Sequence, residues 1–211
     1  MTKKPPLQKP PLPGHPLLTR AEAQTGNDLL TMMGNVLASW QGIEHTIADI
    51  YLVFFSPRRA DAAALAFYAI RTFEARLAIV NSLIAFFCSD ERKVAWADLY
   101  DLARKRSKSR NAVAHGLVMR HGRAPRTEFV IGQSIYDISH FPDPPLKNGF
   151  YTVKELKEMC GTFLSLTKKL DSFREKLAND QGLRARLDAP NQQVQTHEAL
   201  YPLKIQIPTT P

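Results

Sequence analysis

Cysteine is scarce in this chain of 211 residues, which contains only Cys88 and Cys160. Two cysteines are too few for a disulfide framework or for a four-cysteine metal site. Each lies in an apolar pattern of helical spacing, so we expect both to be reduced core residues of a cytoplasmic protein. Because clusters of His, Cys, Asp or Glu at ligand spacing are also missing, we expect no metal and no cofactor.

Long apolar runs are missing as well. The stretch 77–88 is too short to cross a bilayer, and it contains Asn81 and Ser82. The lysines near the N-terminus are not followed by the apolar segment that is typical of a signal peptide. We therefore expect no membrane association.

Acidic residues are absent from the segment 104–126, which holds eight of the 28 basic residues. The remainder of the chain carries 20 basic and 20 acidic residues, so this segment accounts for the whole net charge of +8. Such a local excess is typical of a surface that binds a polyanion. Basic residues also suit the last turns of helices and solvated faces, and this structural interpretation remains open.

The two ends of the chain differ in composition from its middle. Six of the first 16 residues are proline, which prevents a helix, so we expect 1–26 to be a disordered arm or a polyproline ligand. Polar residues and prolines also punctuate the C-terminal end, where the apolar patch 203–207 could dock as an edge strand. We expect a folded domain over 27–180 and a flexible tail over 181–211.

Four segments between these ends carry apolar residues at alternating spacings of three and four, which is the pattern of a helix bundle. They are 27–55, 56–88, 89–116 and 152–179. Asn27 and Ser56 suit N-caps, and Thr152 with Glu155 forms a capping box. The sequence therefore predicts an all-α fold of four long helices in an up-down bundle.

The third segment changes character along its length. Its apolar positions Ala95, Leu99 and Leu102 are followed by Arg106 and Ser109, which predicts that the helix leaves the core there. Gly116 is placed to end this helix in a left-handed cap. The next residues, 117–131, resemble two short strands around a turn, so we expect a small β-hairpin between the third and fourth helices.

The end of the third helix reads Arg110-Asn111-Ala-Val-Ala-His115-Gly116. Imidazole is the usual base near neutral pH, and it can take the proton of an RNA 2′-hydroxyl that attacks the adjacent phosphate. A fixed guanidinium stabilises the charge that develops on the phosphoryl oxygens. This pattern predicts an RNA-cleaving site with Arg110 and His115 as its reactive pair and Asn111 as a polar companion.

Helix geometry sets a condition on this site. In an ideal helix Arg110 and His115 diverge by about 140° and lie about 7.5 Å apart along the axis. They converge on one phosphate only if the arginine folds across the face or the last turn unwinds at Gly116. A two-fold dimer would bring a second His115 into the cleft as the acid for the leaving oxygen. The plainer interpretation is that His115 and Gly116 only finish a helix.

These seven residues resemble the signature of the HEPN domain family, and the expected bundle over 27–180 resembles its architecture. The resemblance implies a helical bundle, a homodimer across the motif helices and metal-independent ribonuclease activity, with Arg110 and His115 as the catalytic pair. Many members are toxins of toxin–antitoxin systems or act in phage defence, which implies an antitoxin or another protein partner. Other members bind nucleotide or are purely structural.

The sequence thus favours a cytoplasmic, homodimeric endoribonuclease. The alternative is a non-catalytic helical adaptor that binds RNA, a nucleotide or a partner protein through the same basic end; a DNA-binding module is disfavoured because helix-turn-helix spacing is absent. Glu44 and His45 lie beside the apolar stripe of the first helix, either directed at a site or simply solvated. The residues that we expect to bind RNA are Arg104, Lys105, Arg106, Lys108, Arg120, Arg123 and Arg126.

Overall fold

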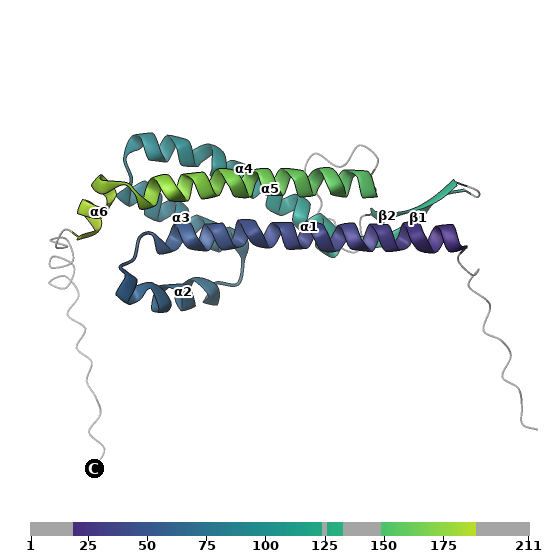
Figure 1. Cartoon of the computed structure of the whole chain (residues 1–211), viewed down its shortest axis with the longest axis horizontal. Helices are drawn as coiled ribbons and strands as arrows, with labels where there is room; N and C mark the ends of the chain where they lie inside the picture. The colour runs from purple at the N-terminus through teal and green to yellow at the C-terminus, as the bar shows by residue number, and fades with distance from the viewer. Residues whose placement is uncertain (1–18, 124–125, 133–148, 189–211) are drawn as a thin grey trace, which may run out of the picture. The chain divides into compact units, whose positions relative to one another are not determined.

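The structure is a computed structural model that describes residues 19–123, 126–132 and 149–188. These residues are mostly helical, with six α-helices, one short 3-10 helix and a three-stranded antiparallel sheet (Figure 1). The described residues divide into two compact units, of which the first lies within 1–44 and 101–168 and the second within 45–100 and 169–211. Every residue of the candidate site below belongs to the first unit.

Helix α1 (Arg20–Leu52) begins earlier than predicted, and the expected N-cap at Asn27 is wrong. Thr19 and Glu22 form a capping box: the Glu22 carboxylate accepts from the Thr19 backbone N–H at 2.9 Å, and the Glu22 N–H donates to the Thr19 hydroxyl at 3.2 Å. The Thr19 N–H is the main reason why the pKa of Glu22 is lowered. The predicted boundary of the N-terminal arm at residue 26 is therefore wrong, because residues 20–26 are already helical.

The buried face of α1 confirms the predicted spacing. Six apolar positions at this spacing are buried: Leu29, Val36, Trp40, Ile43, Ile47 and Ile50. Met33, which belongs to the same predicted stripe, is only half-buried. Full burial of one such side chain stabilises the fold by about 1.5–3 kcal/mol. The apolar stripe is therefore sufficient to fix which side of α1 faces the interior.

The predicted single helix over 56–88 is wrong. It is replaced by three elements: η1 (Pro57–Arg59), α2 (Ala60–Ala69) and α3 (Phe73–Phe87). The break lies at Ile70, whose backbone is extended, and the Thr72 hydroxyl then accepts from the Ala75 N–H at 3.2 Å as the N-cap of α3. The Arg76 Nε–H donates to the Ile70 carbonyl at 2.8 Å and holds the break. A run of apolar residues concealed this cap in the sequence.

Helix α4 (Asp90–His115) ends where the sequence predicts, but its buried face is shifted by one residue. The expected stripe of Ala95, Leu99 and Leu102 is half-buried or exposed. The buried positions are Trp96, Ala103, Ser107, Ala112 and Val113. The expectation that this helix leaves the core after Leu102 is therefore wrong, because small residues keep one side buried while the basic residues occupy the other.

The expected hairpin after α4 is present as β1 (Leu117–Arg123) and β2 (Arg126–Gly132), paired antiparallel with Leu117 opposite Gly132. A two-residue strand that the sequence did not reveal, β3 (Phe150–Tyr151), extends the sheet in the order β1-β2-β3. Ile131 pairs with Tyr151 in this added register. The sheet thus follows directly from the C-terminal end of α4.

Gly116 joins α4 to β1, but not through the expected left-handed cap. Among the described glycines, positive φ occurs at Gly122 and Gly149, so that expectation is wrong. A Cβ at position 116 would lie 2.3 Å from the Ile131 Cγ2 atom and 2.7 Å from the Ala112 carbonyl oxygen. Glycine is needed here because β2 approaches the end of the helix closely.

Helix α5 (Val153–Ala178) confirms its predicted capping box, with the Thr152 N–H donating to Glu155 at 2.8 Å. The apolar residues that give this segment its spacing of three and four are all buried: Leu156, Met159, Phe163, Leu166, Leu170, Phe173 and Leu177. Helix α6 (Gln181–Asp188) was not predicted, and it corrects the expected tail over 181–211. The Asp180 carboxylate accepts from the Leu183 N–H at 3.0 Å and caps it.

The described part of the chain contains no helix that is both long and apolar enough to cross a membrane. The proline-rich residues 1–18 and the apolar patch 203–207 lie outside the described residues. Both cysteines are free; Cys88 is buried, whereas Cys160 is only half-buried.

Candidate functional site

Arg110 is held by two residues of α1. Its Nη2 lies 3.3 Å from the Glu44 Oε1 atom, in a hydrogen-bonded ion pair. Its guanidinium carbon lies 5.3 Å from the centre of the Trp40 ring, within the range of a cation–π contact. The guanidinium is therefore fixed in orientation by a carboxylate and an aromatic face.

Trp40 links this pair to the core. Its indole N–H donates to the same Glu44 oxygen at 2.8 Å, and its ring meets the Phe163 ring edge-on at a centroid distance of 5.3 Å. Trp40 is 2% exposed and Phe163 is fully buried. The Trp40 ring cannot move without disturbing its packing against α5. The Glu44 carboxylate and the Arg110 guanidinium, which contact this ring or its N–H, are therefore restrained as well.

The Arg110–Glu44 pair lies at the edge of the core. The two side chains are 23% and 28% exposed, so solvent reaches both and the free energy of this ion pair is modest. The Arg110 Nε atom is buried and has no hydrogen-bond partner among the described residues. Glu44 occupies one amino group, and the solvent-facing part of the guanidinium remains accessible to an anion.

His115 is the last residue of α4, and its side chain is exposed. Asn111 is half-buried one turn earlier on the same face. Because α4 remains helical through His115, the last turn does not unwind, and Arg110 and His115 leave the helix about 140° apart. Within one chain, Arg110 is therefore directed at α1, and His115 is on an exposed side of α4.

The expected RNA-binding residues occupy three kinds of position. Arg104, Lys105 and Lys108 are exposed on α4, and Arg106 is half-buried. Arg120 on β1 forms an ion pair with Glu22 near the start of α1. Arg123 and Arg126 are opposite each other in the register of β1 and β2. The exposed positive charge of the described residues in this segment thus lies mainly on α4.

A tyrosine of the unpredicted strand fixes the same stretch of α4. Tyr151 on β3 is 4% exposed, and burial raises its pKa to about 12 although a hydrogen bond with the Ser109 side chain acts in the opposite direction. The phenol is therefore neutral at physiological pH and acts as a packing and hydrogen-bonding group. Ser109 precedes Arg110, so β3 restrains the helix at the position where the guanidinium begins.

Glu44 and Trp40 are the functional residues that the motif alone did not identify. Of the two residues noted beside the apolar stripe of α1, Glu44 is directed at the site and His45 is exposed. The signal in the sequence is weak: Trp40 and Glu44 are four residues apart, so they share a helix face. Nothing in the sequence shows that Arg110 lies against that face.

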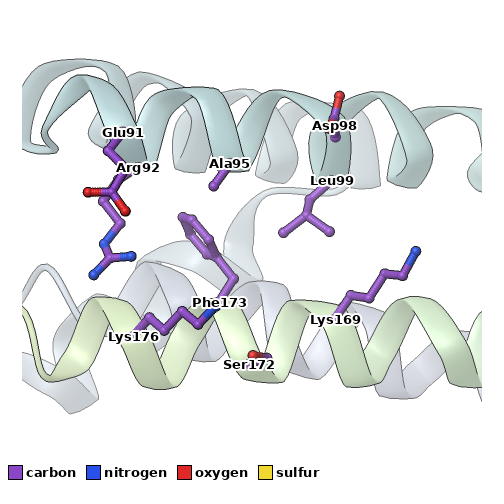
Figure 2. A pocket seen from close by; sticks show the side chains of 9 residues that line it. All are labelled: Glu91, Arg92, Ala95, Asp98, Leu99, Lys169, Ser172, Phe173 and Lys176. Atoms are coloured by element: carbon purple, nitrogen blue, oxygen red, sulfur yellow. The ribbon is translucent and has the colours of Figure 1, made fainter.

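The cavity in Figure 2, of about 400 Å³, lies between α4 and α5 and differs in character from this site; Phe173 and Leu99 point into it. Its rim mixes Lys169 and Lys176 with acidic residues, and its Arg92 is paired with Asp180 at 3.4 Å. Charges of both signs give this cavity no preference for a polyanion.

Groups of three or more His, Cys, Asp or Glu side chains that could hold a metal ion do not occur among the described residues. Comparisons with models of protein families, with curated proteins and with solved structures find no match to this chain.

Proposed function

We propose that this protein is a metal-independent endoribonuclease of the kind implied by the HEPN-like motif, with Arg110 and His115 as its catalytic residues. The observation that supports this proposal most is the fixed guanidinium of Arg110, held 3.3 Å from Glu44 and 5.3 Å from the centre of the Trp40 ring. It lies one and a half turns before the exposed His115, within the only acid-free basic segment of this charge density.

The proposed chemistry uses no metal. The His115 imidazole takes the proton of a ribose 2′-hydroxyl, whose oxygen attacks the adjacent phosphorus and forms a 2′,3′-cyclic phosphate as the bond to the 5′-oxygen breaks. The Arg110 guanidinium stabilises the negative charge on the phosphoryl oxygens. A preoriented guanidinium is effective because it need not reorganise during the reaction. Asn111, on the face of His115, orients the phosphate.

Two copies of the chain complete the proposed site. Because Arg110 and His115 leave α4 about 140° apart, a phosphate bound to Arg110 of one chain is reached by His115 of a second chain. A two-fold arrangement makes two such sites. It also supplies an imidazole as the acid for the departing oxygen, so a single motif per chain is sufficient.

We also propose that the long helices pack in an up-down arrangement. The biological roles that the motif implies are part of the same proposal. A toxin or phage-defence effector with an antitoxin or another protein partner would use such an RNA-cleaving dimer. The basic residues from Arg104 to Arg126 supply the charge that attracts RNA.

The test is cleavage of a single-stranded RNA in the presence of EDTA. We expect the wild type to release fragments that end in a cyclic phosphate, and His115→Ala and Arg110→Ala each to lower the rate at least about 100-fold. His45→Ala is the matched control, since it removes an exposed imidazole of α1. Equal cleavage by the variants and the wild type, or cleavage that needs a divalent metal, would reject the assignment.

The Arg110–Glu44 ion pair also favours a second candidate function. In a non-catalytic adaptor, Arg110 would join α4 to α1 and the exposed basic face would bind RNA, a nucleotide or a partner protein. This candidate predicts salt-sensitive binding of RNA without cleavage products. Arg110→Ala would then lower the stability of the fold and leave RNA binding through α4 largely unchanged.

A further inference from the structure

We propose that a single RNA strand lies lengthwise on the exposed face of α4, with successive phosphates at Lys108 and Arg104 and the reacting linkage at His115. This inference rests on the proposed function, and it adds the class of substrate and the path that it follows. It assigns binding to two of the seven basic residues and separates them from the others.

Helix geometry places these residues in one row. Arg104, Lys108, Asn111 and His115 follow the spacing i, i+4, i+7 and i+11, so they lie within about 60° of one another around α4. Along the axis the row is about 16.5 Å long, in steps of about 4.5–6 Å. Arg104, Lys108 and His115 are exposed, and Asn111 is half-buried. These steps are comparable to the separation of neighbouring phosphates along one strand.

The row is narrow, and the exposed Lys105 flanks it about 60° around α4 from Lys108. On the opposite side of α4, Ala103 and Val113 are buried and Arg110 is directed at Glu44. Arg106 lies on that side too and is half-buried. A narrow row of cations matches one sugar-phosphate backbone, whereas a duplex would offer phosphates of two strands across a groove.

The row of cations on α4 is limited at both ends. Asp101 continues the same face three residues before Arg104 and is exposed. Its carboxylate repels phosphate, so the strand loses its attraction to α4 beyond Arg104. In the other direction the helix ends at His115, and the next arginine, Arg120, is paired with Glu22. The structure thus assigns to the strand a short contact on one side of the reacting linkage.

Binding of a strand that cannot be cleaved tests this path apart from the chemistry. The probe is a fluorescent 2′-O-methyl oligouridine of about 12 nucleotides, which lacks the attacking hydroxyl. Its Kd is measured at several KCl concentrations. Each phosphate contact of a single strand contributes about 0.7 to the slope of log K against log salt, so Arg104→Gln with Lys108→Gln should lower the slope by about 1.4. Binding at 0.1 M KCl should weaken about 25-fold.

The matched control removes the same charge elsewhere in the first unit. Lys157→Gln with Lys168→Gln replaces two exposed lysines of α5, and the slope should stay at its wild-type value. Asp101→Lys should extend the row and raise the slope by about 0.7. An equal loss in the control pair, or no loss in the α4 pair, overturns the inference.

Two further comparisons complete the test. Tighter binding of a blunt duplex of the same length would show that the surface serves double-stranded nucleic acid and would overturn the single-strand path. If the salt slope falls in the Arg104 and Lys108 variant but the wild type cleaves no RNA, the nuclease proposal fails. The proposal that a strand binds along α4 is then retained. Cleavage that requires Arg110 and His115, with a slope that is indifferent to Arg104 and Lys108, rejects the row alone.

Discussion

The Glu44 carboxylate accepts a hydrogen bond from the Arg110 Nη2 atom at 3.3 Å and from the Trp40 indole at 2.8 Å, both at Oε1. One oxygen thus fixes the residue at the start of the motif to the core of the first unit. Because an arginine side chain is otherwise highly flexible, this contact reduces the entropy that phosphate binding would lose. In the proposed enzyme, Glu44 is a positioning residue.

Substitution of Glu44→Gln removes the charge and keeps the shape. We expect the guanidinium to become less well oriented, so kcat for RNA cleavage should fall about 10-fold or more with a smaller change in KM. Glu158→Gln, an exposed glutamate of α5, controls for the change in net charge. If Glu44→Gln only lowered the melting temperature and left kcat unchanged, the carboxylate would be structural.

Mixing two inactive variants tests whether two chains share the site. In a heterodimer of Arg110→Ala and His115→Ala, one site loses both residues and the other keeps the intact arginine and the intact histidine. After random exchange of subunits, the mixture should recover measurable cleavage of at most about a quarter of the wild-type rate, because the restored site keeps Arg110 and only one of the two His115 imidazoles. If each chain used its own pair of residues, the mixture would stay as inactive as its components.

Gly116→Ala should destabilise the protein. The new Cβ would meet Ile131 Cγ2 at 2.3 Å and the Ala112 carbonyl oxygen at 2.7 Å, and relief of such overpacking costs about 1–3 kcal/mol. Gly34→Ala is the control, because a Cβ there has nothing within 4 Å and alanine in a helix stabilises by about 0.5–1 kcal/mol. Thermal melting should move in opposite directions for the two variants; a shared direction would contradict the close approach of β2.

Asp180 should make stability depend on acid pH. The Leu183 N–H is the main cause of its lowered pKa, with smaller contributions from Arg92. A carboxyl group with a lowered folded pKa stabilises above its unfolded pKa, near 3.9, and this stability is lost as pH falls through the folded value. Asp180→Ala should therefore cost about 1 kcal/mol at pH 7, through the lost cap, and progressively less below about pH 4.

The control for this prediction is Asp180→Asn, which keeps a capping oxygen but removes the charge opposite Arg92. Its loss of stability at pH 7 should be smaller than that of the alanine variant. Unfolding followed by circular dichroism from pH 2 to pH 7 measures both. A difference between wild type and Asp180→Ala that stayed constant over this range would contradict the lowered pKa.

The two cysteines should differ in reactivity. Burial raises the pKa of the Cys88 thiol to about 11, so at pH 8 only about 0.1% is thiolate, the reactive form. Cys160 on α5 is half-buried. Iodoacetamide should therefore modify Cys160 first and Cys88 at least about tenfold more slowly in the folded protein. Mass spectrometry of Cys88→Ser and Cys160→Ser measures each rate; faster modification of Cys88 would contradict its burial.

Local patterns were sufficient for several features of the fold. The 3–4 spacing identified the buried faces of α1 and α5, the capping box placed the start of α5, and the motif helix ends at His115 as expected. The turn-rich segment after it forms the predicted hairpin. Each of these depends on residues close together in the chain, where helix period, caps and strand alternation act directly.

Features that depend on distant residues were missed. The break at Ile70 lies within an apolar run that reads as one continuous helix. Burial of Trp96 instead of Ala95 reflects a rotation of α4 by about one residue, which only its packing partners decide. The start of α1 at Arg20 could have been predicted, because the sequence contains the Thr19–Glu22 capping box. This signal was overlooked because prolines dominate the preceding residues.

By itself, the sequence determined the kinds of groups at the end of α4: a guanidinium, an amide and an imidazole inside an acid-free basic segment. Only the tertiary structure decided that Arg110 is directed at Glu44 and Trp40 while His115 is exposed. Spacing along a helix sets the direction in which a side chain leaves the backbone. The partner that it meets depends on which element packs there, and a residue 66 positions away supplies it.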